Sequence, residues 1–277
     1  MTDRQRDLGA ALRDHLDRWQ LRTDGPVREG TASLVAPVVT EDNVPAVLKV
    51  GAHDTAPCHE HLVLRRWGGR GAVRLLRADP PQRAVLLERL HPQSLTTRPD
   101  VEACEIVAGL SGQLHVPPMP QLPSLHAQVT RWVDSAERLP RRSAVPHRLV
   151  EQAAALAREL TAESVDSVVL HGDLHPGNVL AADRQPWLAI SPEPMNGDPH
   201  YELAPTLWHR WHELAHDVRD GVRRRFYTLV DAAGLDEDRA RAWTLIRVVW
   251  NATREPVPGA PADALTRYVA VAKAVQD

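Results

Sequence analysis

The loop at 171–178 contains the residues whose types and spacing are best suited to chemistry. It has the sequence HGDLHPGN and lies between apolar runs that end at Leu170 and begin at Val179. Phosphoryl transfer to a hydroxyl needs a carboxylate to orient the nucleophile and accept its proton, and a nearby oxygen ligand for the metal on the phosphates. Asp173 and Asn178 suit those two roles. The alternative is a hydrogen-bonded turn, because Asp, Gly and Asn are all common turn residues.

The distribution of basic residues singles out a second site. Of 33 basic residues, only Lys49 and Lys273 are lysine. Lys49 lies in the strand-like run AVLKV, where a compact ammonium can do what the wide, planar guanidinium cannot. We therefore interpret Lys49 as a functional cation. The alternative is a surface lysine whose aliphatic stem covers apolar residues.

The elements that would position these residues follow from hydrophobic periodicity. Residues 4–20 have the apolar spacing of an amphipathic helix. A short helix is predicted at about 59–67, before Gly68-Gly69. Strand-like runs occur at 31–40, 46–50, 72–76 and 84–90. The first ninety residues therefore predict a small antiparallel sheet with one inserted helix.

A different pattern begins after Pro92. Prolines between 117 and 123 mark an extended loop. Helices are predicted at about 125–138 and 146–162, and from about Tyr201 onward apart from a break at 255–263. Short strands are predicted at 167–170, 179–181 and 187–190. The fold class expected is α+β with two lobes: an N-terminal lobe at 1–90, and a mainly helical C-terminal lobe at 91–277 that carries catalysis and substrate binding.

Composition narrows the class of protein. The chain has 277 residues, is 43% hydrophobic and 25% charged, and has a net charge of −3, which gives no reason to expect a nucleic-acid partner. No apolar stretch approaches the roughly 18 residues of a membrane span, and the N-terminus has no signal-peptide pattern. Cys58 and Cys104 are too few for a disulfide framework. We expect a cytoplasmic monomer.

The loop and several companion stretches resemble a known family. HGDLHPGN is similar to the catalytic loop of aminoglycoside phosphotransferases, relatives of protein kinases. The stretches WGGRGAVRLL, LLERL and LAISPEPMNGDPHYELAP narrow the resemblance to the streptomycin 6-phosphotransferase and hydroxyurea phosphotransferase branch. The resemblance runs from about Arg18 to Trp250. It implies a two-lobed kinase-like fold with ATP and Mg²⁺ between the lobes, and antibiotic resistance by transfer of phosphate to a small, cationic acceptor such as streptomycin.

The resemblance also assigns roles to individual residues. It makes Asp173 the catalytic base and Asn178 a metal ligand. Lys49 would contact the nucleotide phosphates, with Glu60 pairing with that lysine and aiming it. The remaining nucleotide-binding residues would be Gly30, Thr31 and Ser33 in a phosphate-covering loop, and Glu88 and Leu90 through main-chain groups that bind adenine.

One position departs from the family pattern. The family has a metal-binding Asp thirteen residues after Asn178, where this chain has Ser191. A neutral hydroxyl is a poorer Mg²⁺ ligand than a carboxylate. Glu193 is a possible substitute two residues later. Ser191 therefore leaves two hypotheses open: an active small-molecule kinase, and a catalytically impaired relative that binds nucleotide or drug.

Three carboxylates are candidates for binding a cationic acceptor: Glu202, Glu213 and Asp217. A rival motif overlaps them, because residues 212–216 read HELAH and fit the H-E-x-x-H pattern of zinc proteases. That motif would place His212 and His216 on one helical face, with His209 beside them. The alternative is a polar helix face that lines the acceptor site. The run at 223–225, three arginines, predicts a solvated helix face.

Overall fold

The computed structural model describes residues 3–30, 32–52, 59–136, 138–139, 144–163, 166–214, 216–254 and 263–276. The chain divides into two compact units. The first comprises Met1–Pro92 and Ala182–Leu188, and the second comprises Gln93–Ala181 and Ala189–Asp277. The sequence places the boundary between 90 and 91, close to the end of the first segment, but does not predict that Ala182–Leu188 belongs to the first unit. None of the described helices is long and apolar enough to cross a bilayer.

The first unit is built on an antiparallel sheet. Its strands are β1 (Arg22–Thr23), β2 (Arg28–Glu29), β3 (Ser33–Val39), β4 (Pro45–Gly51), β5 (Leu75–Asp79) and β6 (Ala84–Glu88). They are ordered β1-β3-β4-β6-β5, and β2 pairs with β3. Strand β5 begins three residues later than the sequence pattern predicts, because Ala72 and Val73 are buried ahead of the strand instead of alternating within it.

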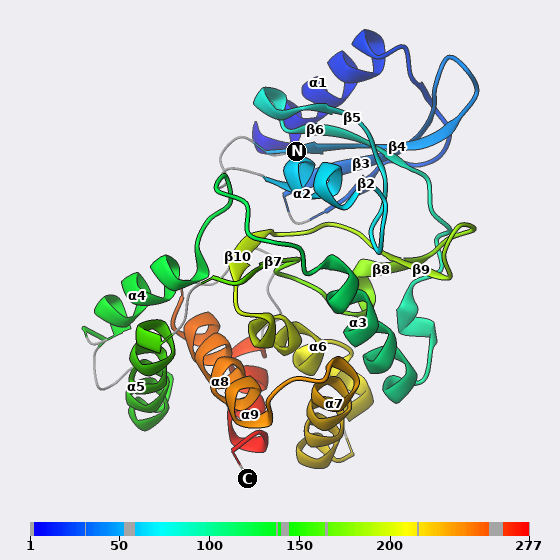
Figure 1. The fold of residues 1–277 in the computed structure, drawn as a ribbon. Helices are drawn as coiled ribbons and strands as arrows, with labels where there is room; N and C mark the ends of the chain where they lie inside the picture. The colour runs from blue at the N-terminus through cyan, green and yellow to red at the C-terminus, as the bar shows by residue number, and fades with distance from the viewer. Residues whose placement is uncertain are drawn as a thin grey trace. The chain divides into compact units, whose positions relative to one another are not determined.

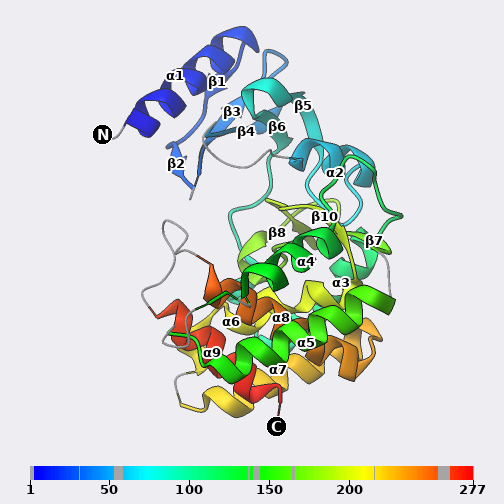
Figure 2. The same ribbon diagram turned by 90° about the vertical axis from the view of Figure 1, so that its left-hand side faces the viewer.

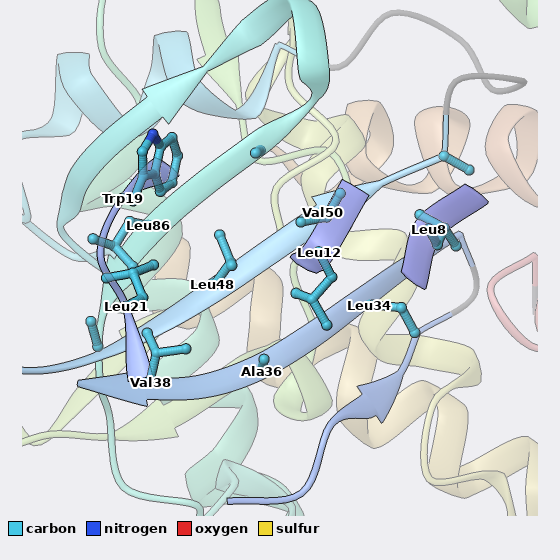
Figure 3. Packing of buried hydrophobic residues seen from close by; sticks show 13 residues of the cluster. Leu8, Leu12, Trp19, Leu21, Leu34, Ala36, Val38, Leu48, Val50 and Leu86 are labelled. Carbon is cyan, nitrogen blue, oxygen red and sulfur yellow. The ribbon is translucent and has the colours of Figure 1, made fainter. Parts of the chain in front are cut away.

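Helix α1 (Asp3–Arg18) covers one face of this sheet. Leu8 and Leu12 of the helix pack over Leu34, Leu48 and Val50, as Figure 3 shows. Alternation explains the arrangement: every second residue of β3 and β4 is buried, so one face of each strand supplies the apolar side chains. Full burial of a leucine side chain stabilises the fold by roughly 1.5–3 kcal/mol.

Helix α2 (Glu60–Trp67) and α1 lie on opposite sides of the sheet (Figure 2). Gly68 ends α2 with φ 60°, in the left-handed region that favours glycine. Lys49 alternates with the buried Leu48 and Val50 on β4, so its side chain leaves the sheet on the face opposite α1. This alternation is what brings Lys49 to α2.

The second unit is mainly helical. Its helices are α3 (Asp100–Leu114), α4 (Leu125–Ala136), α5 (His147–Glu163), α6 (Ala204–Trp208), α7 (Val218–Ala233), α8 (Glu237–Thr253) and α9 (Ala264–Ala274). Successive contacts run α3-α7-α9-α8-α5-α4, an order that can be followed across Figure 1. Helix α8 is deeply packed, with Trp243, Ile246 and Val248 fully buried.

Short strands of the second unit carry the loop singled out by the sequence. They include β7 (Val168–Leu170), β8 (Val179–Ala181) and β10 (Met195–Gly197), while β9 (Trp187–Ala189) lies where the chain returns from the first unit. Strand β7 pairs with β10, with Leu170 opposite Met195. Short 3₁₀ helices connect these elements: η2 (Leu95–Thr97), η3 (Pro176–Asn178), η4 (Pro199–Leu203) and η5 (Trp211–Leu214). The antiparallel N-terminal sheet and the helical C-terminal region expected from the sequence are both present.

Candidate active site

The 171–178 loop begins where β7 ends and runs through η3 into β8. Gly172 makes the sharp turn out of β7, with φ 84°. A Cβ added there would lie 2.0 Å from the carbonyl oxygen of Glu193. Both the backbone angle and the close approach therefore require glycine at this position.

Asp173 and Asn178 are in direct contact. The side-chain amide of Asn178 donates to the main-chain oxygen of Asp173 at 2.8 Å and to its Oδ2 at 3.0 Å. The amide nitrogen is thus committed to Asp173, and the side-chain oxygen of Asn178 is the atom that a metal could use. In the described part of the second unit, Oδ1 of Asp173 makes no hydrogen bond.

Asp173 is held as a carboxylate. Its side chain is 32% exposed, with His175 Nε2 3.5 Å from Oδ2. Burial by itself would raise the pKa of Asp173, but the contact with His175 and the positive charge of Arg247 outweigh it, so the pKa lies below its ordinary value. The carboxylate is therefore ionised at neutral pH and able to accept a proton or orient a hydroxyl.

Glu202 lies beneath the loop and binds its backbone. Its two oxygens accept hydrogen bonds from the main-chain N–H groups of His171 at 2.6 Å and Gly172 at 2.9 Å. The side chain is 1% exposed, and burial raises its pKa. Arg247 of α8 completes the support, donating to the carbonyl oxygens of Gly172 and Tyr201. This placement favours a loop-positioning role for Glu202 over the acceptor contact expected from the sequence.

Ser191 lies next to the 171–178 loop in the fold. The N–H of the preceding residue, Ile190, donates to the Asn178 carbonyl at 2.9 Å and so brings this part of the chain back to the loop. The φ of Ser191 is 56°, a left-handed conformation in which Asn and Asp are several-fold more common than serine. Glu193 is exposed, and its N–H donates to the His171 carbonyl at 2.8 Å. The two positions that the resemblance assigns to metal ligands therefore offer Mg²⁺ an amide oxygen, from Asn178, and a hydroxyl, from Ser191. Both are neutral, a poor fit to an ion usually held by one or two carboxylates.

Lys49 and Glu60 form an ion pair in the first unit. Lys49 Nζ lies 3.0 Å from Oε1 and 2.9 Å from Oε2 of Glu60. Glu60 opens α2 and its side chain is 3% exposed, whereas that of Lys49 is 19% exposed. The carboxylate is therefore buried, whereas part of the lysine side chain still reaches solvent, an arrangement suited to presenting a fixed positive charge to an anion.

The segment expected to cover the nucleotide phosphates is a hairpin between β2 and β3. Gly30 N–H donates to the Ser33 carbonyl at 2.8 Å, and a Cβ at Gly30 would lie 2.8 Å from Ser33 Oγ. Thr31, predicted to bind nucleotide, lies outside the described residues.

Glu88 ends β6, and Leu90 follows it. The N–H of Glu88 donates to the carbonyl of Arg74, and its carboxylate accepts from the Arg184 guanidinium at 3.1 Å. Burial alone would raise the pKa of Glu88, but Arg184 holds it below its usual value. The predicted main-chain role at Glu88 would therefore fall to its carbonyl oxygen, with the main-chain groups of Leu90 beside it.

Glu213 lines a cavity of about 420 Å³ in the second unit, together with Thr96, Arg210, Trp211, His212 and Arg267. Residues close to the cavity lining in the chain contact the 171–178 loop. Ser94 Oγ donates to the Pro176 carbonyl at 2.9 Å, and the ring of His209 stacks on that of His175. The Glu213 carboxylate forms an ion pair with Arg210, whose guanidinium nitrogen lies 2.6 Å from Oε2. Asp217 instead caps α7, accepting from the N–H of Asp220 at 3.1 Å.

The H-E-x-x-H motif does not form the helical pair that its spacing predicts. Residues 211–214 form η5, a 3₁₀ turn, and α7 starts only at Val218. His212 and His216 therefore do not share one α-helical face. Among the described residues, no group of three or more His, Cys, Asp and Glu side chains is arranged to hold a metal. The motif arises from a chain that changes direction between α6 and α7.

Arg225 is also unlike its prediction, because it is 2% exposed instead of solvated. Its guanidinium pairs with Asp100, at 2.8 Å from Oδ2, and donates to the carbonyl of His209 at 2.5 Å. A buried arginine is stable only with such partners. The sequence could not have revealed them, since Asp100 is 125 residues away in the chain.

The amino-acid sequence of the chain is similar to those of two named kinases. The chain is 42% identical to streptomycin 6-kinase from Streptomyces griseus over 97% of this chain and 89% of that one. It is 41% identical to hydroxyurea phosphotransferase from Kitasatospora aureofaciens, over 91% of this chain and 74% of that protein.

The fold is shared with more distant structures. Aminoglycoside phosphotransferase APH(4)-Ia superposes with a TM-score of 0.65 at 16% identity, covering 97% of this chain and 98% of that one. A thermostable mutant of the same enzyme, in a ternary complex with ADP and hygromycin B, gives a TM-score of 0.60 at 15% identity over 95% of this chain and 97% of that one. The predicted two-lobed, kinase-like fold is thus confirmed. Residues 18–257 match the aminoglycoside/hydroxyurea antibiotic resistance kinase family, and the chain is a small-molecule kinase that belongs to it.

Proposed function

We propose that the chain transfers the γ-phosphoryl group of ATP to a hydroxyl of a small polar molecule, an aminoglycoside such as streptomycin. The observation that carries the proposal is the Asp173–Asn178 contact, which orients an ionised carboxylate on a loop held from below by Glu202. Asp173 would orient the acceptor hydroxyl and take its proton as the phosphoryl group moves to the oxygen.

The first unit would hold the nucleotide. In this proposal the Lys49 ammonium, aimed by Glu60, contacts the α- and β-phosphates. Gly30 and Ser33 lie in the hairpin that would cover the phosphates, and main-chain groups of Glu88 and Leu90 would bind adenine. A fixed ammonium neutralises phosphate charge with little reorganisation, since its counter-ion is already in place.

The acceptor would occupy the 420 Å³ cavity that contains Trp211 and Glu213. Its size suits one or two sugar rings, and Trp211 offers a flat apolar wall of the kind that stacks on them. Glu213 supplies the one carboxylate among the described lining residues. It would bind a cationic group of the acceptor in competition with Arg210.

The direct test is ATP-dependent phosphorylation across streptomycin, other aminoglycosides and hydroxyurea, read by mass spectrometry. A gain of about 80 Da, one phosphoryl group, on streptomycin supports the proposal. If only hydroxyurea is phosphorylated, the proposed acceptor is wrong but the proposed reaction, phosphoryl transfer from ATP, still holds. ATP binding without any product would favour a second candidate function, a catalytically impaired relative.

Ser191 is the observation that favours this second candidate. Because the neutral donors present suit Mg²⁺ poorly, we derive no step through a metal and test the position directly. Ser191→Asp adds a carboxylate, whereas Ser191→Asn is a matched control with the same tolerance for a left-handed backbone but no charge. If metal binding limits the chain, Ser191→Asp raises kcat about 10- to 100-fold with Mg²⁺ and Ser191→Asn does not. Equal activity of all three chains would remove the case for impairment.

A further inference from the structure

Two histidine rings lie face to face beside the proposed base. His175 follows Asp173 by two residues in the 171–178 loop, and His209 follows α6. Their ring centroids are 3.4 Å apart and their planes differ by 9°. The side chain of His175 is 10% exposed. Such close, parallel stacking fixes the plane of the His175 ring.

The hydrogen bonds of His175 define which of its nitrogens carries the proton. The main-chain N–H of Gly177 points to Nδ1 at 3.1 Å, so Nδ1 accepts and carries no hydrogen. In the neutral ring the proton is then on Nε2, which lies 3.5 Å from Asp173 Oδ2. His175 therefore directs an N–H group at the carboxylate. It cannot also take the proton of Asp173, because Nε2 is already protonated.

His209 is fixed in the complementary state. Its Nδ1 lies 2.7 Å from the Pro205 carbonyl, which can only accept, so Nδ1 carries the proton. Burial, reinforced by the neighbouring His175, lowers the pKa of His209 to about 4. With His209 uncharged, the stack avoids the repulsion that a charge on both rings would cause.

The backbone of His209 is itself anchored. Arg225, paired with Asp100, donates to the His209 carbonyl at 2.5 Å and to the Leu207 carbonyl at 3.5 Å. The peptide on the C-terminal side of His209 is thus held by a buried ion pair. Loop, ring stack and anchor form a continuous chain of contacts from α3 and α7 to Asp173.

We propose that His175 and His209 act together as positioning residues for Asp173. The His175 Nε2–H group fixes Oδ2 and leaves Oδ1 for the acceptor hydroxyl, while His209 sets the plane of the His175 ring. The proposal rests on the proposed function for the role of Asp173 as base. It assigns His209 a task in the reaction although it lies 36 residues from Asp173 in the sequence.

Paired variants separate the hydrogen bond from the ring. His175→Phe keeps a flat ring but has no donor, whereas His175→Gln keeps a neutral N–H donor at the reach of Nε2. We expect His175→Phe to lower kcat about 10- to 100-fold, the size of a hydrogen bond to a charged group, with KM for ATP and acceptor within about twofold. His175→Gln should restore most of the loss. Parental kcat in His175→Phe would overturn the proposal.

The stack is tested in the same way. His209→Ala removes the ring and should lower kcat about 5- to 10-fold, while His209→Phe keeps a stacking surface and should stay within about twofold of the parent. Equal losses in the two variants would show that the stack is not what matters and would overturn the role of His209.

A measurement without activity distinguishes this proposal from the proposed function. In ¹⁵N-histidine-labelled parent protein near pH 7, long-range ¹H–¹⁵N correlations should show His175 protonated on Nε2 and His209 on Nδ1. His175 protonated on Nδ1 would overturn the pairing whatever the activity. A parent with both expected tautomers that phosphorylates no acceptor contradicts the proposed function, and the positioning role is overturned with it. An active parent with an unaffected His175→Phe variant overturns the positioning role alone.

Discussion

Lys49 lies 2.9 Å from Glu60, and the two side chains differ sharply in exposure: the carboxylate is 3% exposed and the lysine 19%. The buried partner fixes the position of the partly exposed one. Removing Glu60 would free the ammonium to move, whereas removing Lys49 would leave a carboxylate buried without its cation, which typically costs 3–5 kcal/mol. A variant that tests the proposed phosphate contact of Lys49 therefore has to leave the ion pair, and with it the stability of the fold, intact.

Lys49→Arg is the variant that keeps charge and changes shape. Arginine can still pair with Glu60, so we expect the midpoint of thermal unfolding to change little. The guanidinium fork cannot occupy the position of a compact ammonium, and kcat/KM for ATP should fall about 10- to 100-fold. Lys273→Arg, the other lysine, lies exposed near the end of α9 and is the matched control. Equal kinetics for the two variants would contradict a phosphate-binding role for Lys49.

Glu202→Gln tests the support of the 171–178 loop. One carboxylate oxygen becomes an amide that points N–H groups at a backbone N–H, so a buried donor loses its acceptor at a cost of about 1–3 kcal/mol. We expect a lower free energy of unfolding in urea and a kcat reduced about 10-fold, because the loop that carries Asp173 loosens. Glu159→Gln, on an exposed position of α5, should change neither quantity. An increased KM for the acceptor at unchanged stability would instead favour direct substrate contact.

Glu213→Gln tests the proposed acceptor cavity. Loss of its charge should raise KM for streptomycin about 5- to 10-fold and leave KM for ATP unchanged, because the proposed function makes this carboxylate the partner of a cationic group of the acceptor. Asp217→Asn is the comparison variant, since asparagine still caps α7 while the charge is lost. An effect at Asp217 and none at Glu213 would move the acceptor away from the cavity. Steady-state kinetics at saturating ATP provide the measurement.

The stability of the chain should fall as the medium becomes mildly acidic. Burial lowers the pKa of both His115 and His209 to about 4, below the ordinary value near 6.5. Between these two values the unfolded chain binds more protons than the folded one, so the free energy of unfolding decreases as pH falls from about 7 to 4. Urea unfolding at pH 7 and 5 should show a loss smaller by up to about 2 kcal/mol in His209→Phe. His212→Gln, whose ring is 83% exposed, should behave as the parent.

Local periodicity was sufficient for much of the fold. The sequence predicts α1, β3, β4, α2 and β6 within a few residues. Every second residue is buried in β3 and β4, β6 is a continuous apolar run, and apolar residues recur at helical spacing in the helices. Helix α3 was not predicted. Its buried residues, including Ala103, Cys104 and Val107, do recur at helical spacing, but the apolar residues Val101 and Ile106 lie off that face and weaken the contrast between an apolar and a polar side. The strands β1 and β2 have two residues each and are too short to produce a pattern, and β10 contains Asn196 and Gly197, residue types that are depleted in strands.

In the candidate site too, the residues of local motifs were predicted, whereas contacts between residues distant in the sequence were not. Lys49 pairs with Glu60, as the resemblance implies, whereas the contact between Asp173 and Asn178 was not predicted although the motif singled out both residues. The burial of Glu202 and Arg225 depends on partners far along the chain and could not be read from neighbouring residues. The H-E-x-x-H spacing misled for a related reason: the motif assumes one continuous helix, whereas the backbone has turned by Arg210, where φ is 52°.

The segment Ala182–Leu188 has a consequence for how the protein is made. It belongs to the first unit although it is synthesised long after it, and it supplies Arg184 to Glu88 across 96 residues of sequence. On the ribosome the N-terminal unit therefore emerges without one of its own parts. Its final ion pair closes only after α3, α4, α5 and the Asp173 loop have been translated. Completion of the N-terminal unit is thereby delayed until the loop that carries the proposed base exists.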